Sequence, residues 1–483
     1  MHPLYSLYAD RVQECRDVIS GEDTVKSKGT LYLPPLPSHI QKPDRYRAFK
    51  DRATFFNATA RTLAGLVGAV FRKPPIIQNL PPALSQRLAL DSFTPSGSSL
   101  VALSEEVFQE ILTTGRVGIL LDRPFSSDDP QEDPRPFAVL YRTEDILNWT
   151  TQRRGRTLAT TSILLRELED DPAPILSLSV APNPTYRHRL LALDEEGYYY
   201  QQLLDSHLSP TSGRIYLTNR GARLRHIPFI SITPASLTLS PEKPPLLDIV
   251  KLNLSHFRSY ASLEHGRMYT AFPQYYVSFD AEQTGISLEN SEDQEQTAGV
   301  TPYSVDADAV WEIEGGRPGI LEFNGSGLNS LENAIEQKAG QIQALGGRLV
   351  TPMKSMPATS GVALELQELG DAALLLRIAS RVAEAMNLLI SWTIDWEGLS
   401  LPDPAPNFSF QASFTNTKIT GRELRAILAL FKEHAIPRDV LYHGLRESGV
   451  LPPGMTLDEF QELLDNPDQL WRLDPRIFPP DNA

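Results

Sequence analysis

The sequence predicts a protein of the α+β class: an elongated subunit with mainly helical parts, an inserted antiparallel β lobe and a smaller α/β insert. Segments with an apolar residue at every third or fourth position are typical of helices, and segments of period two are typical of strands. Proline-rich joints separate these segments. The composition, 41% apolar and 22% charged over 483 residues, is that of a folded chain with room for several lobes.

The first part of the sequence predicts an arm followed by a helix. Residues 1–43 end in the proline-rich stretch Leu33–Pro37 and are expected to be extended. A helix of roughly 28 residues should follow, with Asp44 as its N-cap and Pro74 directly after it. Its apolar residues recur at spacings typical of a face that packs on a core: Phe49, Ala53, Phe56, Ala60, Leu63, Val67 and Val70.

The next part changes from helix to strand. A helix is predicted at Leu100–Thr113, followed by buried strands at Val117–Leu121 and Phe137–Tyr141 and a helical turn at Glu144–Trp149. Alternating apolar residues and turn signals then predict an antiparallel meander. Its expected strands are Thr157–Leu165, Arg187–Leu193, Tyr198–Leu204, Arg214–Leu217 and His226–Ile232.

A long helix and an acidic insert come next. The helix, Leu246–Ala271, should bury one face: Val250, Leu254, Phe257 and Ala261. Residues 272–327 hold eleven acids and one arginine, a net −10 of the chain's −15. Strands are predicted in this insert at Gln274–Phe279, Ala309–Ile313 and Ile320–Phe323.

The last third of the chain is predicted to be helical. Asn329 and Glu332 resemble a capping box at the start of a helix that ends at Gly346. A loop, Val350–Gly361, has Lys354 as its only charge. The remaining predicted helices are Val362 to about Trp392, Gly421–His434, Arg438–Ser448 and Thr456–Asn466.

Motif searches give no sign of a catalytic, cofactor or metal site. The sequence lacks a phosphate-binding G-x-x-x-x-G-K-[ST] loop and an H-E-x-x-H zinc motif. Cys15 is the only cysteine, which excludes an internal disulfide and suits a reducing cytoplasm. The longest apolar stretch carries Arg377, Arg381 and Glu384, so a buried helix is favoured over a membrane span. We therefore expect no enzyme, cofactor, bound metal or membrane contact, with an enzyme that lacks a recognisable motif as the alternative.

Two motifs and the order of the elements resemble the portal proteins of tailed bacteriophages. Tyr46–Ala53 reads Tyr-Arg-Ala-Phe-Lys-Asp-Arg-Ala, similar to the Tyr-X-X-(Phe/Tyr)-Lys-X-Arg-Ala stretch of a portal-like phage family. Gly68–Pro75 reads Gly-Ala-Val-Phe-Arg-Lys-Pro-Pro, similar to its Gly-X-Val-Phe-X-Lys-Pro-Pro stretch. The stretches Gly115–Asp122 and Tyr141–Trp149 follow in the expected order, and the resemblance covers residues 30–465.

The resemblance implies a ring of about twelve subunits at one vertex of the capsid. Such a ring conducts double-stranded DNA during packaging and ejection and contacts the major capsid protein, the terminase and a tail adaptor, without a cofactor. It is assembled in the host cytoplasm and resides in the virion. The alternative is a ring-forming virion or adaptor protein that does not conduct DNA.

The resemblance also implies a division of the chain. In order, the parts are the N-terminal arm 1–43, wing 44–243, stem helix 244–271, clip 272–327, second stem helix 328–349, tunnel loop 350–361, wing helix and following strand 362–415, and crown with C-terminal tail 416–483.

Three sets of residues are candidates for function. The tunnel loop would line the DNA channel through Thr351, Met353, Lys354, Ser355 and Met356. The acidic surface of the clip would either repel phosphate in the channel or face outward and bind a basic adaptor; it comprises Glu289, Glu292, Asp293, Glu295, Asp306, Asp308, Glu312 and Glu314. Candidate subunit contacts are Arg47, Lys50, Arg61, Arg72, Lys251 and Arg258, of which the first four lie in a segment of net charge +5 (44–73) that is otherwise read as a solvated helix face.

Overall fold

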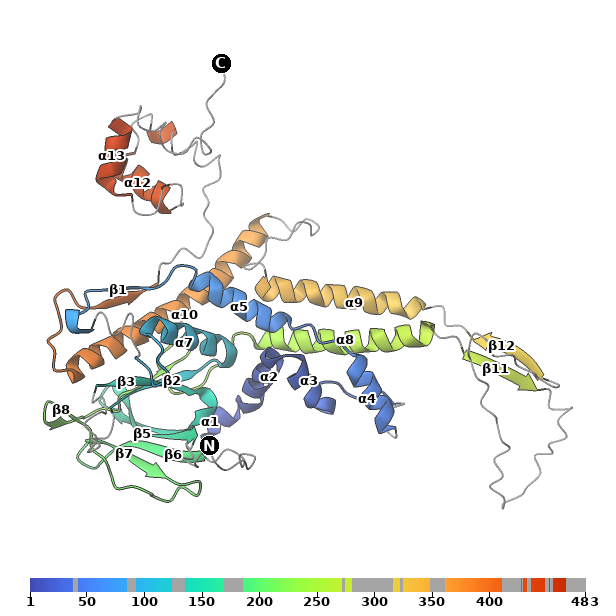
Figure 1. Cartoon of the computed structure of the whole chain (residues 1–483), viewed down its shortest axis with the longest axis horizontal. Coiled ribbons are helices and arrows are strands. Elements are labelled where there is room, and N and C mark those ends of the chain that lie inside the picture. The colour runs from blue at the N-terminus through green and yellow to red at the C-terminus, as the bar shows by residue number, and fades with distance from the viewer. Residues whose placement is uncertain are drawn as a thin grey trace, which may run out of the picture. The chain divides into compact units, whose positions relative to one another are not determined.

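A computed structural model of the chain contains helices and antiparallel sheets in two compact units (Figure 1). Unit 1 comprises residues 1–8, 65–243 and 352–483, and unit 2 comprises residues 9–64 and 244–351. The structure describes residues 1–37, 42–84, 93–123, 135–168, 186–271, 274–279, 316–321, 325–347, 361–410, 427, 429–431, 436–447, 451 and 455–465. The prediction of a mixed helical and sheet protein is confirmed for these residues.

Unit 2 is organised around the long helix α8 (Leu247–Ala271). The face predicted from the sequence is buried, since Val250, Leu254, Phe257 and Ala261 are at most 1% exposed. These side chains share one core with residues from the N-terminal segment, among them Cys15, Val18, Val25, Tyr32 and Phe49. Each fully buried large apolar side chain contributes about 1.5–3 kcal/mol, so this face is a main source of the unit's stability.

The expected extended arm is wrong, because most of residues 9–31 are helical. The segment forms α2 (Ala9–Ser20), α3 (Glu22–Ser27) and the 3-10 turn η1 (Gly29–Leu31). The prolines that led to the prediction lie only after η1. The segment ends against α8, where Arg258 Nε donates a 2.8 Å hydrogen bond to the Tyr32 carbonyl.

The single helix expected after residue 43 is broken into α4 (Pro43–Arg52) and α5 (Ala58–Val70). Asn57 caps α5, since its Oδ1 accepts from the Ala60 amide at 3.0 Å. The break places Phe55 in the core, and Phe56, which the sequence assigned to the apolar face, is 61% exposed. Residues 44–64 consequently group with unit 2 and not with the lobe to which the sequence analysis assigned them.

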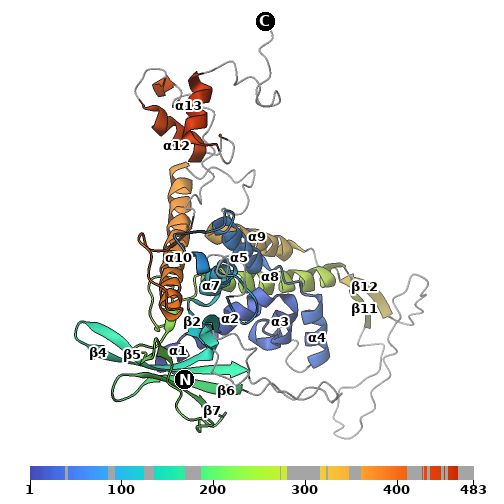
Figure 2. The ribbon, with the colours of Figure 1, turned by 60° about the vertical axis from the view of Figure 1, so that its left-hand side comes forward.

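Helix α9 (Ser326–Ile342) runs alongside α8 and ends in a π-helical turn, η4 (Gln343–Gly347) (Figures 1 and 2). Between the two helices in sequence, β11 (Gln274–Phe279) pairs antiparallel with β12 (Gly316–Leu321). Helix α9 starts earlier than predicted, after Gly325 in the left-handed region (φ 65°). The predicted capping-box residues Asn329 and Glu332 therefore lie inside the helix.

In unit 1 a helix leads into a buried three-stranded sheet of order β10-β2-β3. Helix α7 (Leu100–Thr114) is capped by Ser99, whose Oγ accepts from the Ala102 amide at 3.2 Å. Helix α10 (Gly361–Trp396) contacts α7 and the sheet. The predicted helices and the first two strands are confirmed; the strands are β2 (Val117–Asp122), β3 (Phe137–Arg142) and β10 (Phe229–Ile232).

The predicted meander is confirmed as the four-stranded sheet β4-β5-β6-β7, with three differences. Residues 144–149, predicted as a helical turn, instead belong to the 3-10 turn η3 (Thr143–Asp145) and the start of β4. There Ile146 and Trp149 are buried and pair with β5. Arg214–Leu217 makes only the bridge of Ile215 to Gln201, and β10 pairs with β2 instead of the meander. The sheet strands are β4 (Ile146–Arg154), β5 (Thr157–Leu168), β6 (Tyr186–Leu193) and β7 (Tyr199–Leu204), and the hairpin after Leu217 is β8 (Thr218–Asn219) with β9 (Ala222–Arg223).

Smaller elements complete the described chain. They are α1 (Pro3–Ser6), the ribbon of β1 (Ile76–Gln78) with β13 (Asn407–Ser409), and the helices α12 (Arg438–Glu447) and α13 (Leu457–Asp465). The last two confirm predicted helices and share a small core that includes Tyr442 and Phe460. Of the helix predicted at 421–434, only residues 427 and 429–431 are described.

The contact between α8 and the start of α5 gives a test of unit 2. Asn253 is fully buried; its Oδ1 accepts from the Thr59 amide and hydroxyl at 3.0 and 2.9 Å, and its Nδ2 donates to the Phe56 carbonyl at 2.8 Å. Asn253→Ala leaves these buried groups without a partner and should lower the free energy of unfolding by about 2–4 kcal/mol in urea titrations. Asn333→Ala, on the exposed side of α9, should change it by less than about 0.5 kcal/mol. Equal effects of the two changes would contradict this account.

Candidate functional site

The candidate stem is the hairpin of α8 and α9, which is held by polar contacts as well as by packing. Lys338 Nζ on α9 lies 3.3 Å from the Ser255 carbonyl and 2.5 Å from Ser259 Oγ on α8. Near the other end of the hairpin, Arg267 on α8 binds Glu332 on α9 at 2.8 Å. These contacts fix the register of α8 and α9. In sequence, the β11–β12 ribbon lies between these two helices.

A histidine lies buried in the same hairpin. His256 is 8% exposed, and its Nδ1 has no hydrogen-bond partner among the described residues. Burial lowers the pKa of His256, and the charge of Lys338 lowers it further. Burial also lowers the pKa of Lys338, with Arg258 as a second cause. The hairpin therefore holds a neutral imidazole beside a lysine whose charged form is disfavoured.

The six predicted contact residues have different surroundings in the structure. Arg258 is already engaged inside the chain through the Tyr32 carbonyl, and Arg47, with a side chain 75% exposed, lies 3.9 Å from its helix neighbour Asp44. Lys50 is half-buried. The other three, Arg61, Arg72 and Lys251, are exposed. Arg61 and Lys251 stand two residues from Thr59 and Asn253, on the two helices that this buried contact joins.

The other two predicted sets lie outside the described residues. This holds for the tunnel-loop residues Thr351, Met353, Lys354, Ser355 and Met356. It also holds for the acidic clip residues Glu289, Glu292, Asp293, Glu295, Asp306, Asp308, Glu312 and Glu314. Both sets remain predictions.

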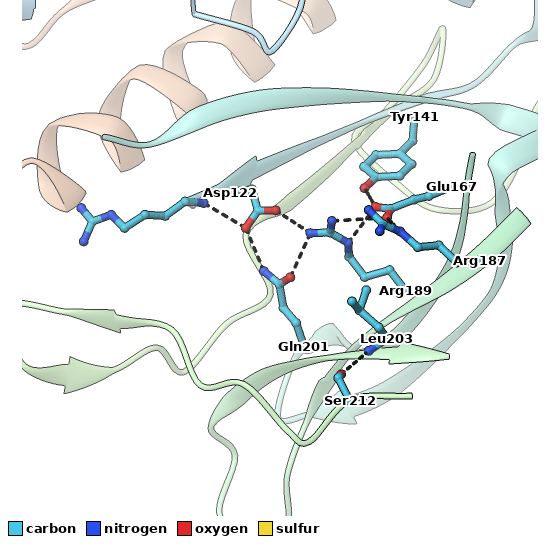
Figure 3. A network of polar contacts seen from close by, with 9 residues as sticks. Asp122, Tyr141, Glu167, Arg187, Arg189, Gln201, Leu203 and Ser212 are labelled. Atoms are coloured by element: carbon cyan, nitrogen blue, oxygen red, sulfur yellow. Dashed lines mark hydrogen bonds and ion pairs between the residues drawn. The ribbon is translucent and has the colours of Figure 1, made fainter. Parts of the chain in front are cut away.

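A polar cluster of unit 1 joins the three-stranded sheet β10-β2-β3 to the four-stranded sheet β4-β5-β6-β7 (Figure 3). Arg189 on β6 binds Asp122 on β2 at 2.5 Å and Glu167 on β5 at 2.7 Å. Gln201 on β7 donates to Asp122 at 3.0 Å, and the Tyr141 hydroxyl donates to Glu167 at 2.5 Å. Burial lowers the pKa of Arg189, but the acidic groups around it outweigh burial and raise it. Because each charge is partnered inside the protein, this cluster stabilises the fold and presents no free acid or base.

A second buried arginine, Arg116, holds the start of β2 without a carboxylate bound to it. Its guanidinium donates to Thr143 Oγ1 at 2.9 Å and to the Leu239 carbonyl at 2.8 Å. It also lies 5.2 and 4.8 Å from the rings of Tyr5 and Trp149. Burial lowers the pKa of Arg116 to about 10. Arg116, from the stretch Gly115–Asp122 noted in the sequence, therefore links α1, through Tyr5, to β4, through Trp149.

The described part of the chain shows neither a metal centre nor a membrane-spanning helix. No group of three or more His, Cys, Asp or Glu side chains there is placed to hold a metal ion. No described helix is long and apolar enough to cross a membrane.

Comparisons with known proteins give one family and several structures. The family described as "Domain of unknown function (DUF4055)" matches residues 245–397, about a third of the chain, from α8 to the end of α10. A comparison with curated proteins finds no match.

Three solved structures are similar at low identity. The chain resembles a chain in the "Neck of native GTA particle computed with C12 symmetry" (13% identity, 84% of this chain and 89% of that chain, TM-score 0.37). The second is in the "Neck of empty GTA particle computed with C6 symmetry" (12%, 85% and 89%, 0.38). The third is in the "Virion of native gene transfer agent (GTA) particle" (12%, 82% and 87%, 0.36). At these TM-scores the likeness assigns neither a fold nor a function.

The buried network of unit 1 predicts unequal effects for two neighbouring arginines. Arg189→Met leaves Asp122 and Glu167 buried without their cation and should cost about 3–5 kcal/mol of stability. Arg187 binds the same Glu167 at 3.1 Å from a side chain 38% exposed, so Arg187→Met should cost about 1 kcal/mol or less. Urea unfolding of the two variants measures both values. Similar losses would show that the network is not the tie between the sheets.

The buried histidine predicts a pH dependence. The folded pKa of His256 lies below the unfolded value of 6.5, so the unfolded state binds more protons as the pH falls through 6.5. The contribution of neutral His256 is fully present above that value and declines below it until the folded state also protonates. The melting temperature should therefore fall more between about pH 7.5 and about pH 5.5 in the wild type than in His256→Gln. His207→Gln, at an exposed position, should behave like the wild type. An undiminished pH effect in His256→Gln would refute the assignment.

Proposed function

We propose that the chain is the portal subunit of a tailed bacteriophage, which assembles as a ring of about twelve copies at one capsid vertex. The ring conducts double-stranded DNA during packaging and ejection, contacts the major capsid protein, and binds the terminase and later a tail adaptor. This proposal rests on the portal-like motifs of the sequence together with one structural observation. That observation is the α8–α9 hairpin, which holds a two-stranded ribbon between its helices and is followed by the long helix α10.

The charge distribution of unit 2 supports a cyclic assembly. A closed ring needs two different, complementary surfaces on each subunit, because each copy contacts the next head to tail. The exposed bases Arg61 and Lys251 lie on α5 and α8, whereas the exposed acid Glu336 lies on α9, one turn from the Glu332 that Arg267 binds. We assign the basic face of α5 and α8 and the acidic face of α9 to opposite sides of the subunit contact.

The acidic insert supports a conduit for DNA. Proteins that hold DNA neutralise its phosphates with lysine and arginine, and they bind tightly at low salt. Residues 272–327, with a net charge of −10, would instead repel a sliding duplex or present carboxylates to a basic adaptor. Facing the channel, this segment would favour transit of DNA over its retention; facing outward, it would bind the adaptor instead.

The mass of the purified full chain in solution tests assembly. The wild type should form a species of about twelve times 53.8 kDa. The double change Arg61→Glu and Lys251→Glu should shift the population to monomers, since it places acids against acids at the contact. Arg156→Glu, an exposed position in the β4–β5 turn, should still assemble.

The outcomes separate the parts of the proposal. A wild-type chain that remains a monomer at high concentration rejects ring assembly. A doubly reversed variant that assembles like the wild type rejects the assigned contact and leaves the ring standing. A ring without an open channel supports a virion or adaptor ring that does not conduct DNA.

A further inference from the structure

The edge of the meander in unit 1 presents arginine and tyrosine on one face. The bridge of Gln201 to Ile215 and the hydrogen bond from the Tyr199 amide to the Leu224 carbonyl (2.8 Å) align three segments side by side. Tyr199, Leu217 and Leu224 are buried on one side of this edge. Because side chains alternate along extended backbone, their neighbours share the opposite side. These neighbours, called the Arg–Tyr array below, are Tyr198, Tyr200, Arg214, Tyr216, Arg223 and Arg225.

The array is a continuous stack of guanidinium groups and rings. Arg225 lies 4.8 Å from the Tyr198 ring, and Arg223 lies 5.8 Å from that ring and 4.2 Å from the Tyr216 ring. At the other end, Arg214 lies 4.7 Å from the Tyr200 ring. A guanidinium stacked on a ring keeps its N–H edge in the plane of the fork, where it can bind a carboxylate or a phosphate with two hydrogen bonds.

The array carries three arginines, and the adjoining turn carries Asp194, Glu195 and Glu196. The three arginines are exposed. Asp194 accepts from the Tyr198 amide at 2.7 Å and from the Tyr216 side chain, and it attracts Arg223. Asp194 thus contacts the array directly, and within the array Arg225 donates from Nη2 to the Tyr198 hydroxyl at 3.1 Å. The exposed N–H edges of these guanidinium groups can bind the carboxylates of a partner with two hydrogen bonds each.

A pocket lies directly beside the array and shares Arg225 with it. Its volume is about 440 Å³, within the range of about 300–1,000 Å³ usual for binding pockets. His226 joins Arg225 in its lining, and the His226 ring lies 5.2 Å from the Trp392 ring. The rest of the lining is largely apolar and comes from β5, β6, β10 and α10; it includes Ile163, Leu193, Phe229, Ile230, Leu388 and Trp392.

The array and the pocket together favour an acidic protein segment over a nucleic acid as the anionic partner. A nucleic acid would supply phosphates, but its bases would find the tyrosine faces already covered by arginine. It also has no large aliphatic or aromatic side chain to fill an apolar pocket. A protein segment supplies both a carboxylate for the array and an apolar anchor for the pocket.

We propose that the Arg–Tyr array and the adjoining pocket form a docking site for a protein segment that carries a large apolar residue next to acidic residues. The apolar residue enters the pocket beside Trp392, and the carboxylates bind the forks of Arg225 and Arg223. This site lies within unit 1 and does not depend on ring assembly or on DNA transit.

Binding of labelled peptides to the full chain tests the site. The probes are fluorescein-labelled peptides with a single Trp, Phe or Leu at different distances from a Glu-Glu pair, measured by fluorescence anisotropy. At least one of them should bind, with about tenfold or greater loss when its apolar residue is replaced by Ser. Arg225→Gln and Arg223→Gln should each weaken binding about threefold to fivefold. Ala159→Leu, which places a larger side chain in the pocket lining, should weaken it without changing the charge.

An exposed arginine far from the array in sequence provides the control. Arg156→Gln, an exposed arginine in the β4–β5 turn, should leave peptide binding within about twofold of the wild type. Binding of a short oligothymidylate more tightly than any peptide would reject the protein partner in favour of nucleic acid. Absence of peptide binding, or peptide affinity unchanged by Arg225→Gln, would overturn the proposal.

Discussion

The packing of α8 on two sides is the constraint on which unit 2 depends. One face of this helix is buried by the N-terminal helices, and another is held against α9 by the contacts of Lys338 and Arg267. Asn253 ties the same helix to the start of α5. A side chain lost from α8 therefore loosens the N-terminal segment and the hairpin together. Such shared dependence suits a rigid strut, since α8 and α9 are the described helices directly before and after the β11–β12 ribbon in sequence.

Unit 1, in contrast, buries the charged side chains of Arg116 and Arg189 beside its sheets. Arg189 is matched by two carboxylates, whereas Arg116 is held by carbonyls, a hydroxyl and aromatic rings. In both cases the guanidinium group binds partners inside the chain. The exposed arginines of the Arg–Tyr array differ because their forks remain accessible at the surface. The unit thus separates arginines that stabilise the fold from arginines available for binding.

Periodicity predicted the long elements because burial dictates their sequence pattern. The buried face of α8, the helix α7 and three strands of the meander follow from spacing and local chemistry. Long-range contacts account for the errors. The break before α5 depends on Asn57, and on Asn253 nearly two hundred residues away in sequence, and the N-terminal helices are stabilised by a core that α8 completes. The basic contact set remains a prediction, and one of its members, Arg258, binds its own chain. The buried network and the Arg–Tyr array were missed, although Arg214 with Tyr216, and Arg223 with Arg225, at alternate positions could have indicated the latter.

The central claim is that these subunits close into a ring around a channel, with the α8–α9 hairpin as the stem. Head-to-tail contacts close only if the rotation between neighbours divides a full turn; otherwise they generate filaments. Electron cryomicroscopy of the purified full chain tests this claim most directly. The account predicts closed rings of uniform size whose central opening admits B-form DNA, with the paired helices α8 and α9 around that opening. Monomers, open filaments, or rings with α8 and α9 on the outer rim would contradict it.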